Sequence, residues 1–157
     1  MSQLQKLTQQ INEEIDHMIQ IASSQSEETI ERKPSEEAWS IKEILCHAEE
    51  ASLYWVNEVL AVVKKNSEVW GRTLADENRL AGVARSKEMT MEKILRDLEK
   101  VKPYIANTLS TLNEEELYVE APSRNPKFGT RSMAFVLEHF MVEHLHNHVK
   151  QMERNIS

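Results

Sequence analysis

Four long stretches of the sequence place apolar residues three or four positions apart, and this periodicity constrains the fold more than any other feature. An α-helix turns once every 3.6 residues, so such spacing gives each stretch one continuous apolar face. The chain has only three glycines and four prolines in 157 residues, which leaves few turn signals to divide these stretches into short strands. The pattern therefore predicts an all-α protein made of a few long helices.

The apolar stripes also give the expected bounds of the helices, which are about 2–22, 40–63, 90–112 and 132–154. The second start is the clearest, because Ser40 followed by Glu43 is typical of a capping box. Four amphipathic helices bury their faces best as a bundle, so we expect a single four-helix bundle domain over residues 1–157. The link Lys64–Met89 is long enough to cross the bundle. The second and third helices could then run parallel, which would give an up-down-down-up topology.

Charge and composition exclude several classes of partner. The net charge is −7, and no run of lysines and arginines offers the basic stripe that phosphate backbones require. No apolar stretch reaches the length of a membrane span, and the N-terminal residues lack the apolar core of a signal peptide. The single cysteine, Cys46, cannot form an internal disulfide, which fits a reducing compartment. We expect a cytoplasmic protein with no nucleic-acid and no membrane partner.

Three histidines fall on faces that should be buried. His144 and His148 are four residues apart on the last helix, so both project from the face that carries Leu145. His47 points inward from the second helix. A lone inward histidine is more often a core residue, but buried imidazoles need hydrogen bonds or a ligand. Together the three favour one divalent metal ion, whereas His139 and His146 share a polar face and are expected to point to solvent.

Other metal patterns fit the sequence less well. Leu145 follows His144 where a zincin protease has glutamate. A di-iron bundle needs two Glu-x-x-His motifs, and the one match, from Glu143 to His146, lies on the polar face. Cys46 is rotated by about 100° from His47 around the helix, so we expect it to be a small core residue and not a ligand.

Two stretches resemble motifs of the DinB-like family, which includes damage-inducible DinB proteins and bacillithiol S-transferase-like proteins. Trp39–Glu50, WSIKEILCHAEE, resembles the second-helix motif, and Glu143–Met152, EHLHNHVKQM, resembles the last-helix motif with its two histidines four apart. The resemblance extends from about Leu7 to Met152. It implies the up-down-down-up bundle, a three-histidine metal site on the same residues, His47, His144 and His148, and a homodimer.

The expected activity depends on both the site and the resemblance. Three protein ligands leave an open coordination position, as in catalytic metal sites, and characterised relatives include thiol-dependent enzymes such as bacillithiol or mycothiol S-transferases and a maleylpyruvate isomerase. We expect a metal-dependent thiol S-transferase that holds one nickel or zinc ion and joins a small-molecule thiol to an electrophile. Glu50 and Tyr54, within two turns of His47, are candidates for contacts with the ligands or the substrate, although such residues are more often packed or solvated. The alternatives are a metal-dependent hydrolase using metal-bound hydroxide and a non-catalytic metal-binding stress-response dimer.

Overall fold

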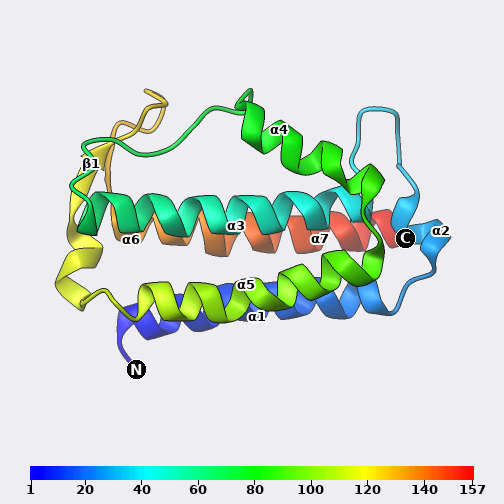
Figure 1. Ribbon diagram of the computed structural model, residues 1–157, viewed down its shortest axis with the longest axis horizontal. Helices are drawn as coiled ribbons and strands as arrows, with labels where there is room; N and C mark the ends of the chain where they lie inside the picture. The colour runs from blue at the N-terminus through cyan, green and yellow to red at the C-terminus, as the bar shows by residue number, and fades with distance from the viewer.

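In the computed structural model, which describes residues 1–157, long amphipathic helices form a four-helix bundle (Figure 1). The rods of the bundle are α1 (Gln3–Ser23), α3 (Ile41–Lys64), α5 (Met91–Leu109) and a last rod made of α6 (Met133–Leu137), the π-helical segment η3 (Glu138–Glu143) and α7 (His144–Ile156). Helix α1 and the last rod run in one direction, and α3 and α5 run in the other (Figure 1). The predicted up-down-down-up topology is therefore confirmed.

Side-chain caps explain where the long helices begin. Ser2, Ser40, Thr90 and Ser132 each accept a hydrogen bond from a backbone N–H of the first turn, which satisfies a donor that has no partner inside the helix. At α3 the capping box is complete, because the Glu43 carboxylate also accepts from the Ser40 N–H at 2.9 Å. This local signal fixes the start of the helix that carries His47.

The inner faces of the rods form one hydrophobic core. The buried residues of α1 and α5 are all apolar, and they join those of α3, α6 and α7 in a single cluster. Such burial is the main favourable term in folding. The outer faces stay polar, and no helix is both long and apolar enough to cross a membrane.

The connections contain shorter elements that the apolar periodicity did not predict. They are α2 (Glu27–Glu31), α4 (Glu77–Ala84), η1 (Arg85–Glu88), η2 (Glu114–Tyr118), β1 (Glu120–Pro122) and β2 (Thr130–Ser132). The two strands pair antiparallel, with Ala121 opposite Arg131. Helix α4 lies across the outside of α3 (Figure 1). The approach is close at Gly82, where a Cβ would lie 3.0 Å from the Cβ and Cγ of Glu50.

Trp70 fastens the long link to the rest of the molecule. Its side chain is fully buried, and its indole Nε1 donates a 2.6 Å hydrogen bond to the carbonyl of Ala121 in β1. Its ring also lies against Trp55 of α3 and Phe140 of η3. A buried indole with a satisfied N–H is a strong anchor, so the link and the hairpin hold each other at one side of the bundle.

Candidate metal centre

The structure brings together the three histidines that the sequence predicts as metal ligands. His47 comes from α3 and is almost fully buried, whereas His144 and His148 come from successive turns of α7 and are partly buried. The Nε2 atom of His144 lies 3.4 Å from Nε2 of His47 and 2.9 Å from Nε2 of His148. One ligand atom from each residue lies within 4.8 Å of the other two.

These separations fit a shared metal ion. Two nitrogens that are each about 2.0–2.1 Å from one ion, at tetrahedral or octahedral angles, lie about 3 Å apart. The three imidazoles converge without a carboxylate among them, which is a donor set suited to zinc, nickel, copper or iron. The Nδ1 atom of His47 is buried and has no hydrogen-bond partner. The nitrogen of His47 that converges with the other imidazoles is Nε2, on the opposite side of the ring.

Electrostatics keeps the imidazoles in the form that binds metals. Burial is the largest cause of the low pKa values: it lowers the pKa of His47 to about 2 and that of His144 to about 3. The pKa of His148 is lowered too, again mainly by burial. Neutral imidazole is the metal-binding form, so these side chains are ready to bind an ion at neutral pH.

A second interaction orients His148. Its Nδ1 lies 2.8 Å from the Oε1 atom of Gln151. An amide oxygen can only accept, so Nδ1 carries the proton and the lone pair of Nε2 faces the centre. Partners of this kind fix the orientation of a metal-binding imidazole.

The π-helical segment η3 directly precedes the two histidines of α7. It turns Phe140 toward α3, where the ring stacks on Trp55 with centroids 4.1 Å apart, while Met141 enters the core. Isolated π-turns inside α-helices occur frequently at functional sites. Here the segment places an aromatic side chain beside the histidines.

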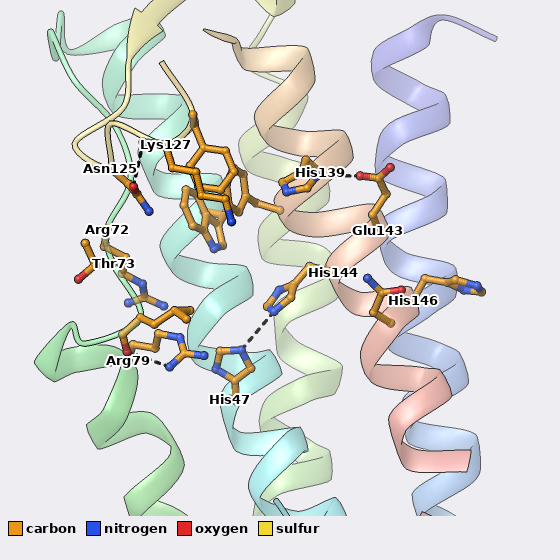
Figure 2. Close-up of a pocket in the computed structure, with 15 residues that line it drawn as sticks. His47, Arg72, Thr73, Arg79, Asn125, Lys127, His139, Glu143, His144 and His146 are labelled. Carbon is orange, nitrogen blue, oxygen red and sulfur yellow. Dashed lines mark hydrogen bonds and ion pairs between the residues drawn. The ribbon is translucent and has the colours of Figure 1, made fainter. Parts of the chain in front are cut away.

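A cavity of about 730 Å³ opens over His47 and His144 (Figure 2). Its apolar wall comes from Trp55, Leu74, Phe128 and Phe140, and its polar lining includes Arg72, Thr73, Arg79, Asn125, Lys127, His139, Glu143, His146 and Asn147. The link and α4 supply one side, the loop after β1 another, and the last rod a third (Figure 2). The centre therefore faces a space large enough for a small organic ligand.

Glu50 and Tyr54, the other candidates from the sequence, do not line this cavity. The Glu50 carboxylate binds both Nη atoms of Arg72, at 2.6 and 2.7 Å, and the guanidinium also lies 3.9 Å from the ring centroid of Tyr54. Tyr54 donates to Glu58 at 2.9 Å, and burial raises its pKa well above the ordinary value. Both residues contact Arg72, which itself lines the cavity, from the side away from it.

The remaining residues that the sequence singled out divide between the cavity and the core. His139 and His146 are exposed, as expected, but both lie at the cavity rim, each 3.1 Å from a carboxylate oxygen, of Glu143 and Glu14 respectively. Cys46 is buried in the core and is not part of the histidine cluster. Burial raises the pKa of its thiol to about 11.

Three residues of the cavity lining, Arg79, Asn125 and Lys127, could not be predicted from the sequence. They belong to the link and to the loop after β1, where no periodic pattern marks an inward face. The only local signal is Asp76, whose carboxylate accepts from the Arg79 N–H at 3.0 Å and caps α4. It could have revealed the helix, but not the cavity.

Comparison with known proteins identifies the family and supports the fold. The DinB superfamily matches residues 10–152 of the sequence. Among solved structures, YfiT from Bacillus subtilis, a probable metal-dependent hydrolase with an unusual four-helix bundle topology, is similar with a TM-score of 0.75 and 14% identity over 98% of this chain and 87% of that chain. At this identity the likeness shows a shared fold. No match was found among curated proteins.

Proposed function

The chain belongs to the DinB superfamily, and we propose that it is a metal-dependent enzyme that joins a small-molecule thiol to an electrophile. His47, His144 and His148 would hold one divalent ion, nickel or zinc. The observation that carries the proposal is the convergence of three Nε2 atoms, with separations of 2.9 and 3.4 Å, beside a cavity of about 730 Å³ that His47 and His144 line.

The protein's own residues supply binding and orientation. When bound, a divalent ion with three neutral protein ligands and an open position lowers the pKa of a thiol or a water molecule that it coordinates. In the overall reaction the sulfur forms a bond to the electrophilic atom, the leaving group departs with its electron pair, and the thiol proton passes to solvent. Trp55 and Phe140 would hold an apolar part of the substrate.

Hydrolysis is the second candidate, favoured by the similarity of fold to YfiT, a probable metal-dependent hydrolase. In that reaction water would take the place of the thiol, so no thiol would be consumed. The same three histidines and the same cavity would serve, because both reactions need an open position on the ion.

Metal content is the first test. Elemental mass spectrometry on tag-free protein, after incubation with zinc or nickel and removal of excess metal, should find about one equivalent in the parent protein. His47→Ala and His148→Ala should lose it. His17→Ala, which removes an exposed histidine of α1, should retain it. A parent protein that holds no ion would overturn the proposal.

Activity assays then separate the two reactions. Loaded protein is incubated with bacillithiol and monochlorobimane, and the losses of thiol and of bimane are compared. Thiol transfer predicts equal losses that His47→Ala abolishes. If the protein instead cleaves an activated ester in the absence of thiol and transfers no thiol to bimane, hydrolysis would be the better proposal. Retained metal with neither activity over broader substrate panels would favour the non-catalytic metal-binding alternative.

A further inference from the structure

Two cations of the cavity, Arg79 and Lys127, have no carboxylate within ion-pair distance, and Arg79 is the partly buried one of the two. The one hydrogen bond of its side chain to the protein runs from Nη1 to the carbonyl of Leu74, at 3.0 Å. A guanidinium offers five N–H donors in a planar fork. The guanidinium also lies 5.6 Å from the centroid of the Trp39 ring, but that contact uses no N–H donor, so Arg79 has donors left for a ligand.

Arg72, the neighbouring arginine in the cavity wall, has a guanidinium that is fully engaged by other residues of the protein. Arg72 is bound by Glu50 through two hydrogen bonds, lies 3.4 Å from an Asp76 carboxylate oxygen, and packs on the ring of Tyr54. Its side chain is only 6% exposed. The two nearby carboxylates, those of Glu50 and Asp76, are therefore paired with Arg72 and act on Arg79 only from beyond ion-pair distance.

Arg79 is also close to the histidines. Its side chain points toward His47 in the cavity (Figure 2). Its charge also contributes to the low pKa of His47, of His144 and of His148, after burial. The guanidinium therefore lines the same cavity as His47 and His144.

The charges of this region call for an anion. Three neutral imidazoles leave the two positive charges of a divalent ion without compensation, and Arg79 adds a third. Lys127, a cation at the exposed side of the cavity, has no ion pair either. The cavity's one carboxylate, that of Glu143, pairs with His139. Attraction between opposite charges is strong where water is largely excluded, so a negatively charged ligand is the natural complement.

We propose that Arg79 recognises the carboxylate of a small organic acid, whose apolar body lies against Trp55 and Phe140. The inference rests on the proposed function, because it assigns a substrate class to that same cavity. A planar guanidinium matches a carboxylate with two parallel hydrogen bonds. The stacked pair of Trp55 and Phe140 gives a flat apolar surface on which an aromatic or aliphatic group packs.

The test uses two probes of nearly equal shape, phenylacetate and its neutral analogue phenylacetamide. Both are titrated by calorimetry into zinc-loaded parent protein and into Arg79→Gln, Arg79→Lys and Arg96→Gln. The last variant removes the same charge from the exposed face of α5 and serves as the matched control. Metal content is measured for every preparation before the titration.

We expect Arg79→Gln to weaken phenylacetate binding by about 10- to 100-fold, the range for hydrogen bonds to a charged group. It should leave phenylacetamide binding unchanged. Arg79→Lys keeps the charge without the fork and should give an intermediate loss, while Arg96→Gln should match the parent protein.

Several results would overturn the inference. Unchanged phenylacetate affinity in Arg79→Gln, with metal retained, would mean that the carboxylate binds elsewhere, and an equal loss for both probes would mean that Arg79 only shapes the cavity. Failure of phenylacetate to bind the parent protein would also contradict it. If the parent protein holds no zinc, the proposed function fails on its own. The same titrations on metal-free protein would then decide the role of Arg79 by the same comparison.

Discussion

The two halves of the bundle are built differently. Where α1 meets α5, every buried side chain is apolar. Where α3 meets the last rod, the buried and partly buried side chains include three imidazoles, the indole of Trp55 and the ring of Phe140. The first contact lowers the free energy of the fold through hydrophobic burial alone. The second buries groups whose desolvation costs free energy, which the lowered pKa values of the histidines record.

This difference indicates that one half of the bundle serves stability and the other serves binding. A polar group that is costly to bury and makes no compensating contact within the protein indicates a role in binding. The fully buried residues of the α1–α5 half are all apolar, and its two buried polar atoms without a partner, Asn12 Oδ1 and Glu14 Oε2, belong to partly buried side chains of α1. This half therefore mainly serves stability. The α3–α7 half loses stability to hold the histidines, and substitutions in the two halves should therefore change different measured quantities.

The largest effect on stability should come from the α1–α5 half. Leu98→Ala removes a fully buried side chain of α5 and should lower the free energy of unfolding by about 2–5 kcal/mol, through lost burial and the cavity left behind. Urea unfolding measures this change, and the metal content of the folded variant should stay at the parent level. Leu80→Ala, at an exposed position of α4, is the control and should cost less than about 0.5 kcal/mol. Loss of metal from folded Leu98→Ala would break the division between the halves.

His144→Ala should do the opposite of Leu98→Ala: it should lose metal affinity but keep stability. Losing a direct ligand should weaken zinc binding by more than about 100-fold, since losing even an outer partner typically costs 10- to 100-fold. Chelator competition measures the affinity, with the exposed His146→Ala as control. Urea unfolding of the metal-free variant should show unchanged or increased stability, because a costly buried imidazole is gone. A large loss of stability in that metal-free comparison would show that the histidine is instead a core residue.

Helix α3 also has two different sides. Cys46 lies on the core side, although it is adjacent in sequence to His47 at the site. Burial raises its pKa from 9.0 to about 11, so its thiolate fraction near neutral pH should be about 100-fold below that of a free thiol. Iodoacetamide should label the native protein at least that much more slowly than the urea-unfolded protein. Rapid native labelling would contradict the burial.

The same shift predicts a pH dependence of stability. The folded state holds the thiol proton more tightly than the unfolded state, so this contribution is complete below about pH 9 and is lost as the pH rises toward about 11. Parent protein should therefore lose more stability than Cys46→Ala over this window. Urea unfolding at pH 8, 9, 10 and 11 gives the comparison, and parallel curves would contradict it.

The smallest predicted effect concerns Gln151, which orients His148 through its Nδ1 atom. Gln151→Ala should weaken zinc binding by about 10- to 100-fold, the usual range for such partners. Lys150→Ala, the exposed neighbour, is the matched control in the same chelator competition. If Gln151→Ala and the parent protein bind zinc with equal affinity, Gln151 does not contribute to metal binding.

The sequence predicted the parts of this molecule that depend on local periodicity. Leu7, Ile11 and Ile15 mark the inner face of α1 and are buried, and the capping box at Ser40 starts α3 where expected. The histidine cluster followed from the same reasoning, because the faces of two packed helices must meet. For these features, knowing which side of a helix is apolar was enough.

The walls of the cavity could not be predicted in this way. Helix α4 buries only Gly82 and Val83, too few residues for a periodic stripe. The link is held in place by Trp70, whose indole binds a carbonyl 51 positions away. The positions of Arg79 and Lys127 thus depend on contacts between segments that are distant in sequence, and no local pattern reports them.

The π-helical segment η3 has a consequence for how chains of this kind can vary in length. A π-turn closes its hydrogen bond over five residues where an α-turn closes over four, so it takes in one extra residue while the helix on either side keeps its alignment. A homologous chain with one residue fewer between Leu137 and His144 could form an unbroken α-helix there and still direct both imidazoles toward His47. Insertions and deletions, which normally disrupt a helix that carries a binding site, can therefore accumulate at this one turn.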